Sequence, residues 1–149
     1  MDIGRKLDLS VYYYIKDVFS DAPFINVVDG FPETEFNLPT IAVELDNIDT
    51  YVLELGNHER GKIRTWFIDV FAKDKSQRDE YAYRLISRLE DNIPVYNYDE
   101  GFPPSSTPSL LGAISTDRIN MQIVKVIPDL TDMLYYRAVV TFTGEYNSM

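Results

Sequence analysis

The chain has 149 residues, contains no cysteine and carries a formal net charge of −10. A chain of this length is typical of one domain that buries its own core, so we expect a single domain over residues 1–149. The absence of cysteine excludes disulfides, thiolate catalysis and cysteine-based zinc sites. The acidic balance disfavours ordinary binding to nucleic acid, because phosphate groups repel a negative surface.

The excess of acidic over basic residues, 24 against 14, leaves two interpretations open. It keeps the domain soluble, or it forms a negative wall along which DNA slides without adhering. No apolar run reaches the roughly 18–20 residues that span a bilayer, and the first residues lack the apolar region of a signal peptide. We therefore expect a protein that is neither exported nor membrane-spanning.

The first predicted element is an amphipathic helix over Asp8–Ser20. Its apolar residues recur at helical spacing, at Leu7, Val11, Tyr14, Ile15 and Val18. Pro23 ends this pattern. The interruptions by glycine and proline that follow predict an irregular connection over Phe24–Pro39.

Alternation of apolar and polar residues then predicts strands. One strand is expected over Thr40–Leu45 and a second over Tyr51–Leu55, with a turn near Asn47 and Asp49. The polar segment Gly56–Gly61 has the length of a hairpin connection.

The next predicted strand, Ile63–Ala72, is apolar on both faces. A strand of this kind belongs in the centre of a sheet or at a subunit contact, so Trp66 is a candidate interface residue. A helix follows, for which Ser76 and Asp79 form an N-terminal capping pattern. Its buried stripe is expected at Tyr81, Ala82, Leu85, Ile86 and Leu89, and Asn92 and Pro94 are expected to end it.

The C-terminal third contains a short predicted strand, Val95–Tyr98, and a long loop rich in proline and serine, Asp99–Ser109. Two longer strands are predicted over Ile119–Ile127 and Leu134–Thr143, joined by a turn at Pro128–Asp132. Helices and strands are therefore segregated along the chain. This order predicts an α+β fold with a mainly antiparallel sheet and two helices packed on it.

No residue pattern typical of catalysis or of metal or cofactor binding is present. His58 is the only histidine and lies in a polar loop without a clear partner for general-base chemistry. The glycines form neither a dinucleotide-binding nor a phosphate-binding loop. The cluster of Asp46, Asn47 and Asp49 lacks the glycine and glutamate of a calcium loop. We expect no catalytic residue, no metal and no cofactor, and a protein that is not an enzyme.

One carboxylate, Asp69, interrupts the otherwise apolar strand Ile63–Ala72. A carboxylate in such a position is costly unless it is paired. Asp69 therefore faces solvent, pairs with an arginine or meets a neighbouring subunit. Arg137 in the last strand is the first partner to test, and both residues are candidate interface residues.

Tyrosine is unusually frequent, with 11 in the chain, often in pairs or runs. Aromatic residues with a polar tip are favoured at protein–protein contacts, whereas stacking on single-stranded nucleic acid requires basic flanks that are missing here. Core packing remains the other use of these rings. The candidate interface residues from this group and from the proline-rich loop are Tyr96, Tyr98, Phe102 and Tyr135.

Several segments together resemble a known family. They are Leu38–Leu45, Phe67–Ala72 with Gln77–Tyr81 after it, and the closing run Tyr135–Phe142. With the helix that opens the chain, they are similar in element order and texture to the tail terminator, or tail completion, proteins of long-tailed phages and to related head-to-tail joining proteins. The resemblance covers most of the chain and includes no invariant motif.

The resemblance implies a non-enzymatic virion protein at the head-proximal end of the tail, assembled in the host cytoplasm. Members of that family form a hexameric ring on the last ring of tail tube protein, end tube growth and offer a docking face to the head. The implied partners are other copies of the chain, the tail tube protein and head completion or connector proteins. DNA would pass through the channel without specific binding. The alternatives are a bacterial binding module or accessory subunit and, third, an enzyme that uses carboxylates alone.

Overall fold

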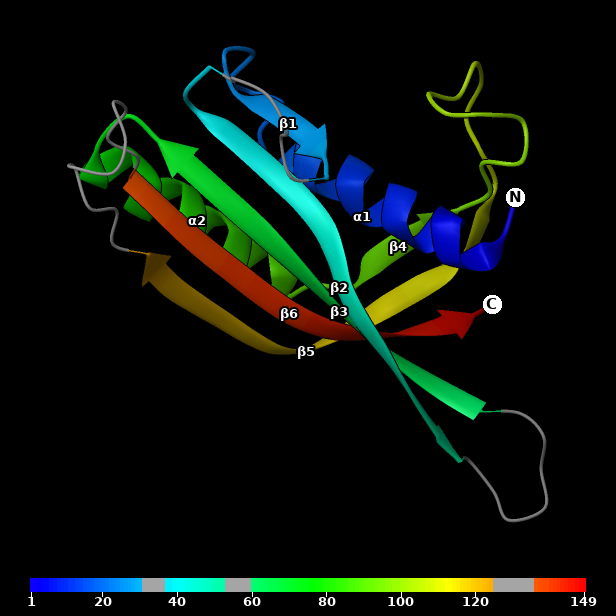
Figure 1. The fold of residues 1–149 in the computed structure, drawn as a ribbon. Coiled ribbons are helices and arrows are strands. Elements are labelled where there is room, and N and C mark those ends of the chain that lie inside the picture. Colours follow the sequence, from blue (N-terminus) through cyan, green and yellow to red (C-terminus); the bar gives the residue numbers. More distant parts are fainter. Residues whose placement is uncertain (31–36, 53–59, 125–135) are drawn as a thin grey trace.

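The computed structural model describes residues 1–30, 37–52, 60–124 and 136–149, without the side chain of Arg60. Within these ranges, two helices and six strands follow one another (Figure 1). They are α1 (Ile3–Val18), β1 (Asn26–Asp29), β2 (Thr40–Val52), β3 (Arg60–Ala72), α2 (Lys75–Leu89), β4 (Ile93–Tyr96), β5 (Leu110–Val124) and β6 (Tyr136–Ser148). The predicted α+β class is confirmed.

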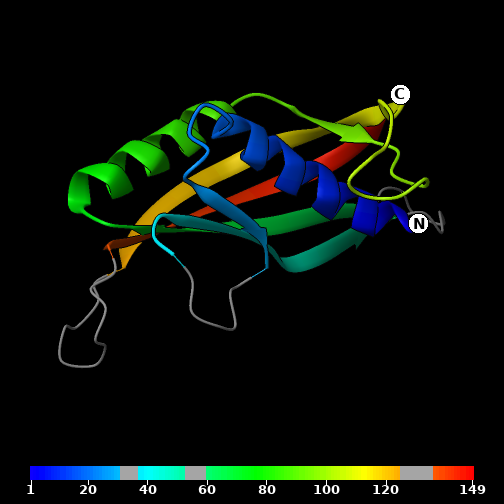
Figure 2. The same ribbon diagram turned by 90° about the horizontal axis from the view of Figure 1, so that it is seen from above.

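The strands form one sheet in the order β1-β2-β3-β6-β5-β4. All neighbouring strands are antiparallel except β1 and β2, which are parallel. Both helices lie on the same face of the sheet, as the view from above shows (Figure 2). The opposite face, which carries neither helix, is called the helix-free face below.

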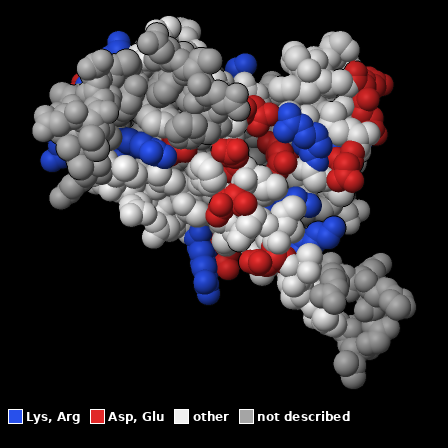
Figure 3. Space-filling view, in the orientation of Figure 1, with Lys and Arg blue, Asp and Glu red and all other residues white. Residues whose placement is uncertain are grey.

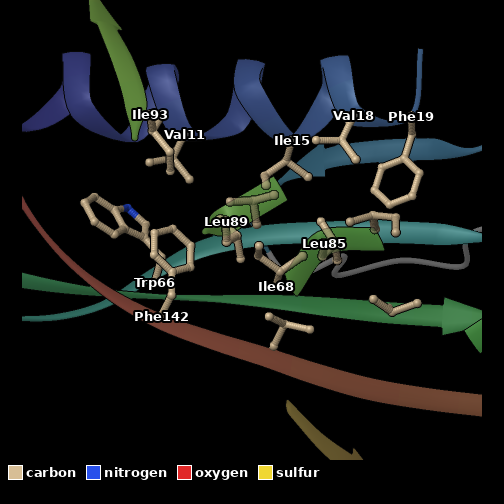
Figure 4. Packing of buried hydrophobic residues seen from close by; sticks show 14 of the residues in the cluster. Val11, Ile15, Val18, Phe19, Trp66, Ile68, Leu85, Leu89, Ile93 and Phe142 are labelled. Atoms are coloured by element: carbon tan, nitrogen blue, oxygen red, sulfur yellow. The ribbon is translucent and has the colours of Figure 1, made fainter. Parts of the chain in front are cut away.

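The core lies between the two helices and the sheet (Figure 4). From the helices, Ile15 and Leu85 are fully buried, and they contact a cluster that includes Ile68 of β3. Trp66 and Phe142, which are paired across β3 and β6, stack with ring centroids 5.4 Å apart. Long apolar side chains from both helices thus cover the central strands.

Two β-bulges bend the sheet across its middle. One interrupts β2 after Leu45, and the other interrupts β5 after Asp117. The stacked pair Trp66–Phe142 lies between them on the central strands. Because a bulge bends its strand and increases the local twist, the long strands curve at the level of this pair.

The helix ends differ from the sequence predictions. Helix α1 begins at Ile3, five residues before the predicted start, because the Asp2 side chain accepts a hydrogen bond from the backbone N–H of Gly4 at 2.8 Å. In α2 the cap is Asp74, which accepts from the N–H of Gln77 at 2.8 Å, and the predicted cap Ser76 lies inside the helix. Both caps are aspartates, which are favoured at this position. The apolar periodicity predicts the start of α1 too late, and the capping pattern of Ser76 and Asp79 predicts the start of α2 too late.

Two predictions in the N-terminal half of the chain were wrong. Strand β1 lies within the segment predicted to be irregular, because four residues paired at an edge are too few for alternation to reveal. The turn predicted near Asn47 and Asp49 is absent, and β2 runs through both residues. The turn is expected because Asn47 and Asp49 are residue types that favour turns, but the strand accommodates them through a bulge after Leu45.

The last strands are confirmed with different limits. Strand β4 begins at Ile93 and includes Pro94, and β5 begins at Leu110, nine residues before the predicted start. Strand β6 continues to Ser148. The predicted turn Pro128–Asp132 and most of the predicted hairpin connection Gly56–Gly61 lie outside the described residues.

Candidate interaction surfaces

The helix-free face carries a set of acidic side chains. Directly paired residues on neighbouring strands point to the same side of a sheet, so the register assigns each residue to a face. The register places four carboxylates on the helix-free face. Glu44 pairs with Phe67, Asp49 with Ile63, Asp117 with Thr143 and Glu145 with Ser115. In the part of the chain that the structure describes, none of the four forms an ion pair.

Basic residues are scarce on the same face. Arg137 is its one basic residue among the paired positions of the described strands, and it neutralises Asp69. Figure 3 views the molecule from this side and shows acidic side chains about the middle of the face, with basic ones beside them. The paired strand positions of this face therefore have a net negative charge.

The ion pair between Asp69 and Arg137 confirms the predicted partner. Asp69 is 0% exposed, and one of its oxygens accepts from both Nη2 of Arg137, at 2.7 Å, and Nε, at 3.0 Å. The Arg137 guanidinium also lies over the ring of Phe71, 5.2 Å from its centroid. The second oxygen, Oδ2, is buried and has no hydrogen-bond partner among the described residues. This pair holds the centre of the helix-free face together and needs no subunit contact to satisfy Asp69 Oδ1.

Trp66 occupies a different environment from the one expected of an interface residue. Its side chain is 1% exposed, stacks on Phe142 and donates a hydrogen bond from Nε1 to Asp8 at 3.0 Å. The two-faced strand is central in the sheet, and its apolar side chains on the helix side, including Trp66, fill the core. The surface that a partner can reach therefore lies elsewhere. Tyr135 lies outside the described residues.

The structure brings three other candidate interface residues together. Phe102, from the long loop, contacts Tyr98 edge to face at 5.2 Å and also contacts Tyr12 and Tyr13 of α1. Tyr96 joins through Tyr98, at 6.4 Å. We call Tyr12, Tyr13, Tyr96, Tyr98 and Phe102 the aromatic cluster. The run of tyrosines in α1 was the sequence signal for it, but nothing in the sequence indicated that α1 meets the loop.

The aromatic cluster forms one side of a surface hollow of about 460 Å³. Tyr13, Tyr96 and Tyr98 line it together with Pro104, Pro108 and the residues between them. Tyr98 is 1% exposed, whereas Tyr13 is 46% exposed, so Tyr98 forms the floor and Tyr13 offers a ring to a partner. Burial raises the pKa of Tyr98 and of Tyr12 above its ordinary value, and the Asp29 charge adds to the effect on Tyr12.

The loop that carries Phe102 is tied to the start of α1. Asp99 accepts hydrogen bonds from the N-terminal ammonium and from Lys6, each at 3.0 Å. These contacts lower the pKa of Asp99, the ammonium having the larger effect. The loop is thus attached at Asp99 and at Phe102.

A second hollow, of about 340 Å³, is lined by carboxylates, the residue type on which the enzyme alternative depends. Asp8, Asp29 and Glu44 line it with Arg5. Burial raises the pKa of Asp8, although the hydrogen bond from Trp66 opposes this shift. Asp29 is in an ion pair with Arg5 at 2.8 Å. In the described residues, no group of three or more histidine, cysteine or acidic side chains is arranged to hold a metal ion.

The outer half of the β2–β3 pair extends beyond the rest of the sheet (Figure 1). Strand β6 pairs with β3 only as far as Arg64, whereas β2 and β3 continue together to the pair Val52–Arg60. We call Asn47–Val52 and Arg60–Arg64 the arm. It exposes apolar side chains: Ile48 is 43%, Val52 is 55% and Ile63 is 38% exposed.

One contact ties the arm to the sheet on the helix-free face. The Tyr51 hydroxyl donates to a Glu145 carboxylate oxygen. A Cβ atom at Gly61 would overlap the Tyr51 ring, so glycine is needed where the ring crosses β3. The arm is therefore held in place by Tyr51 while its apolar side chains stay exposed.

Comparisons with known proteins show the following. No family model and no curated protein matches the chain. One chain from a solved structure titled "Virion of native gene transfer agent (GTA) particle" aligns over 99% of this chain and 98% of its own length, with 11% identity and a TM-score of 0.48. Neither described helix is long and apolar enough to cross a membrane.

Proposed function

We propose that the protein is a structural subunit of a phage virion that closes the tail tube as a ring. The ring caps the last ring of tail tube protein, ends tube polymerisation and provides the face on which the head docks. Six copies per ring and these partners come from the family resemblance alone. The place of action is the head-proximal end of the tail, after assembly in the host cytoplasm.

The observation that carries the proposal is the acidic helix-free face. Glu44, Asp49, Asp117 and Glu145 lie on a sheet surface with no ion pairs of their own in the described residues. DNA adheres to proteins chiefly through lysine and arginine contacts to its phosphates. A channel wall with this composition lets DNA pass without being held. The helices then lie on the outside of the ring.

The test is genetic. Deletion of the gene from its phage should yield tails of uncontrolled length, or heads without joined tails, under the electron microscope. Complementation with the wild-type gene should restore normal particles. Tails of normal length attached to heads in the deletion strain would overturn the proposal, whatever the oligomeric state of the isolated protein.

The hollow beside the aromatic cluster favours a second candidate, a non-enzymatic binding module. Tyrosine rings next to prolines and hydroxyl groups are suited to hold an extended peptide. The two candidates differ in which surface matters. Tyr13→Ala should abolish function in a binding module, whereas neutralising the four acids of the helix-free face should abolish it in a channel.

A further inference from the structure

The sheet has two open edges, one at each end of the strand order. Strand β1 covers β2 only at Thr40–Val43, and strand β4 covers β5 only at Leu110–Ile114. Beyond these short strands, no described segment pairs with the outer edge of β2 as far as Val52 or with that of β5 as far as Val124. Unpaired N–H and C=O groups along such an edge are a template for another strand.

The two open edges contain regular segments of equal length. After its bulge, β2 is regular over Asn47–Val52, and after its bulge β5 is regular over Ile119–Val124. Strands β2 and β5 run in opposite directions, because three successive antiparallel pairings separate them. A rotation that places β5 of the next copy beside β2 therefore creates an antiparallel pair, without turning the copy over.

The register that superposes these segments also matches their faces. It places Ile48 opposite Ile123 and Val52 opposite Ile119. All four side chains belong to the helix side, because each pairs within its own sheet with a residue of that side: Ile48 with Arg64, Ile123 with Ala138, Val52 with Arg60 and Ile119 with Phe142. A slip of one residue would set each side chain against one that points to the other face.

The same register accounts for exposed apolar side chains. Ile48, Val52 and Ile123 are 43%, 55% and 46% exposed in the single chain. Pairing would cover all three with each other and with Ile119. On the helix-free face, Asp49 would lie opposite Gln122 and Tyr51 opposite Asn120, which keeps that surface polar.

We propose that the arm of one copy pairs with Ile119–Val124 of the next copy, so that the sheet continues from subunit to subunit. This inference rests on the proposed ring and assigns its contact surface. Such contacts are heterologous, and they close into a ring when the rotation closes. The two segments lie at different levels of the sheet, so neighbouring copies are staggered along the strands, as tilted strands in a closed barrel require.

The absence of cysteine allows a direct test by disulfide trapping. Asp49→Cys and Gln122→Cys are prepared as two separate full-length variants, since both side chains are exposed and would face each other. Opposed residues of an antiparallel pair have Cα atoms about 4.5–5.5 Å apart, which a disulfide can bridge. Under oxidising conditions, a mixture of the two should give a disulfide dimer that neither gives alone. The double variant should give a ladder ending at the ring.

Matched controls separate this pairing from chance collision. Asp49→Cys mixed with Tyr83→Cys, which is 61% exposed on α2, should give no dimer. Adding Ile48→Lys to the Asp49→Cys variant should remove the trapped dimer. Adding Ile63→Lys, which also changes an exposed arm isoleucine but on the helix-free side of β3, should leave it.

The outcomes distinguish this inference from the proposed function. Rings without the disulfide between Asp49→Cys and Gln122→Cys would overturn the edge pairing and leave the ring intact. A disulfide dimer from Asp49→Cys alone would show two-fold pairing of arms and would overturn the inference. Trapped open chains that never close would support the edge pairing and overturn the ring. No trapped dimer and no ring would overturn the edge pairing, and the deletion phenotype would then decide the proposed function.

Discussion

The two halves of the β2–β3 pair share the same strands but differ in burial. In the inner half, Ile41 and Ile68 are 0% exposed and lie under the helices. In the arm, Ile48 and Val52 are 43% and 55% exposed, and β6 no longer accompanies β3. One half contributes to the core, and the other extends from it.

This difference separates the residues that stabilise the fold from those available to a partner. Burial of an apolar side chain stabilises a fold in proportion to the area removed from water. The arm removes little such area within one chain. Its apolar side chains are thus available for a contact with another molecule, and the predictions below test that separation.

The largest effect is expected in the inner half. Trp66→Ala should lower the free energy of unfolding by about 3–5 kcal/mol, because it leaves a cavity beside Phe142 and removes the hydrogen bond to Asp8. Urea denaturation measures the change. Ile63→Ala in the arm is the control, and a similar loss there would contradict the separation.

A smaller loss is expected from breaking the buried ion pair on the helix-free face. Arg137→Met leaves Asp69 buried and without its partner, which should cost about 3 kcal/mol. Adding Asp69→Val should recover part of this loss, because the uncompensated charge is removed. If adding Asp69→Val lowers the free energy of unfolding of the Arg137→Met variant further, the two side chains do not act as a pair.

The aromatic cluster should contribute less, since Phe102 is only half-buried. Phe102→Ala removes edge contacts to Tyr98 and Tyr12 and should cost about 1 kcal/mol. Amide hydrogen exchange at Gly101 and Ser105 should become faster in the variant, while exchange in β3 stays unchanged. Unchanged exchange in the loop would mean that Phe102 does not anchor it.

Tyrosine ionisation should distinguish the buried cluster from the arm. The pKa of Tyr98 is raised by burial, and that of Tyr51 is raised chiefly by its hydrogen bond to Glu145. Above pH 10.0 the unfolded chain loses a phenol proton that the folded protein still keeps. The contribution of the raised pKa to the free energy of unfolding is therefore complete below pH 10.0 and is lost as the pH rises further. Ultraviolet absorbance follows the ionisation. Glu145→Gln should return the pKa of Tyr51 towards 10.0 and leave that of Tyr98 raised.

The smallest effect on stability is expected at the proposed contact. Ile48→Ser should change the free energy of unfolding by no more than about 0.5 kcal/mol, because the side chain is exposed in the single chain. The same variant should lose the ability to form rings, as light scattering and electron microscopy would show. A variant that forms normal rings would indicate that the arm is not the contact.

Much of the fold could be predicted because local patterns carry it. Periodicity predicts the apolar stripe of α2 and the two-faced strand β3. A lone carboxylate in an apolar strand leaves three environments open for Asp69, and the structure shows the pair with Arg137, the first partner to test. The prediction of secondary structure failed where a strand was too short to show alternation or where a bulge interrupted the alternation. Strand β1 has four residues, and the bulge after Leu45 changes which residues of β2 face the core.

The sequence by itself determined the class of fold, the acidic charge and the exclusion of cysteine chemistry, because composition and periodicity are local properties of the chain. It could not place Trp66 in the core rather than at a contact, nor bring Phe102 onto Tyr12, because both depend on which distant segments pack together. Only the tertiary structure decided which edges of the sheet remain open. An edge is open because β1 and β4 are shorter than the strands they cover, and this follows from pairing between segments far apart in the chain.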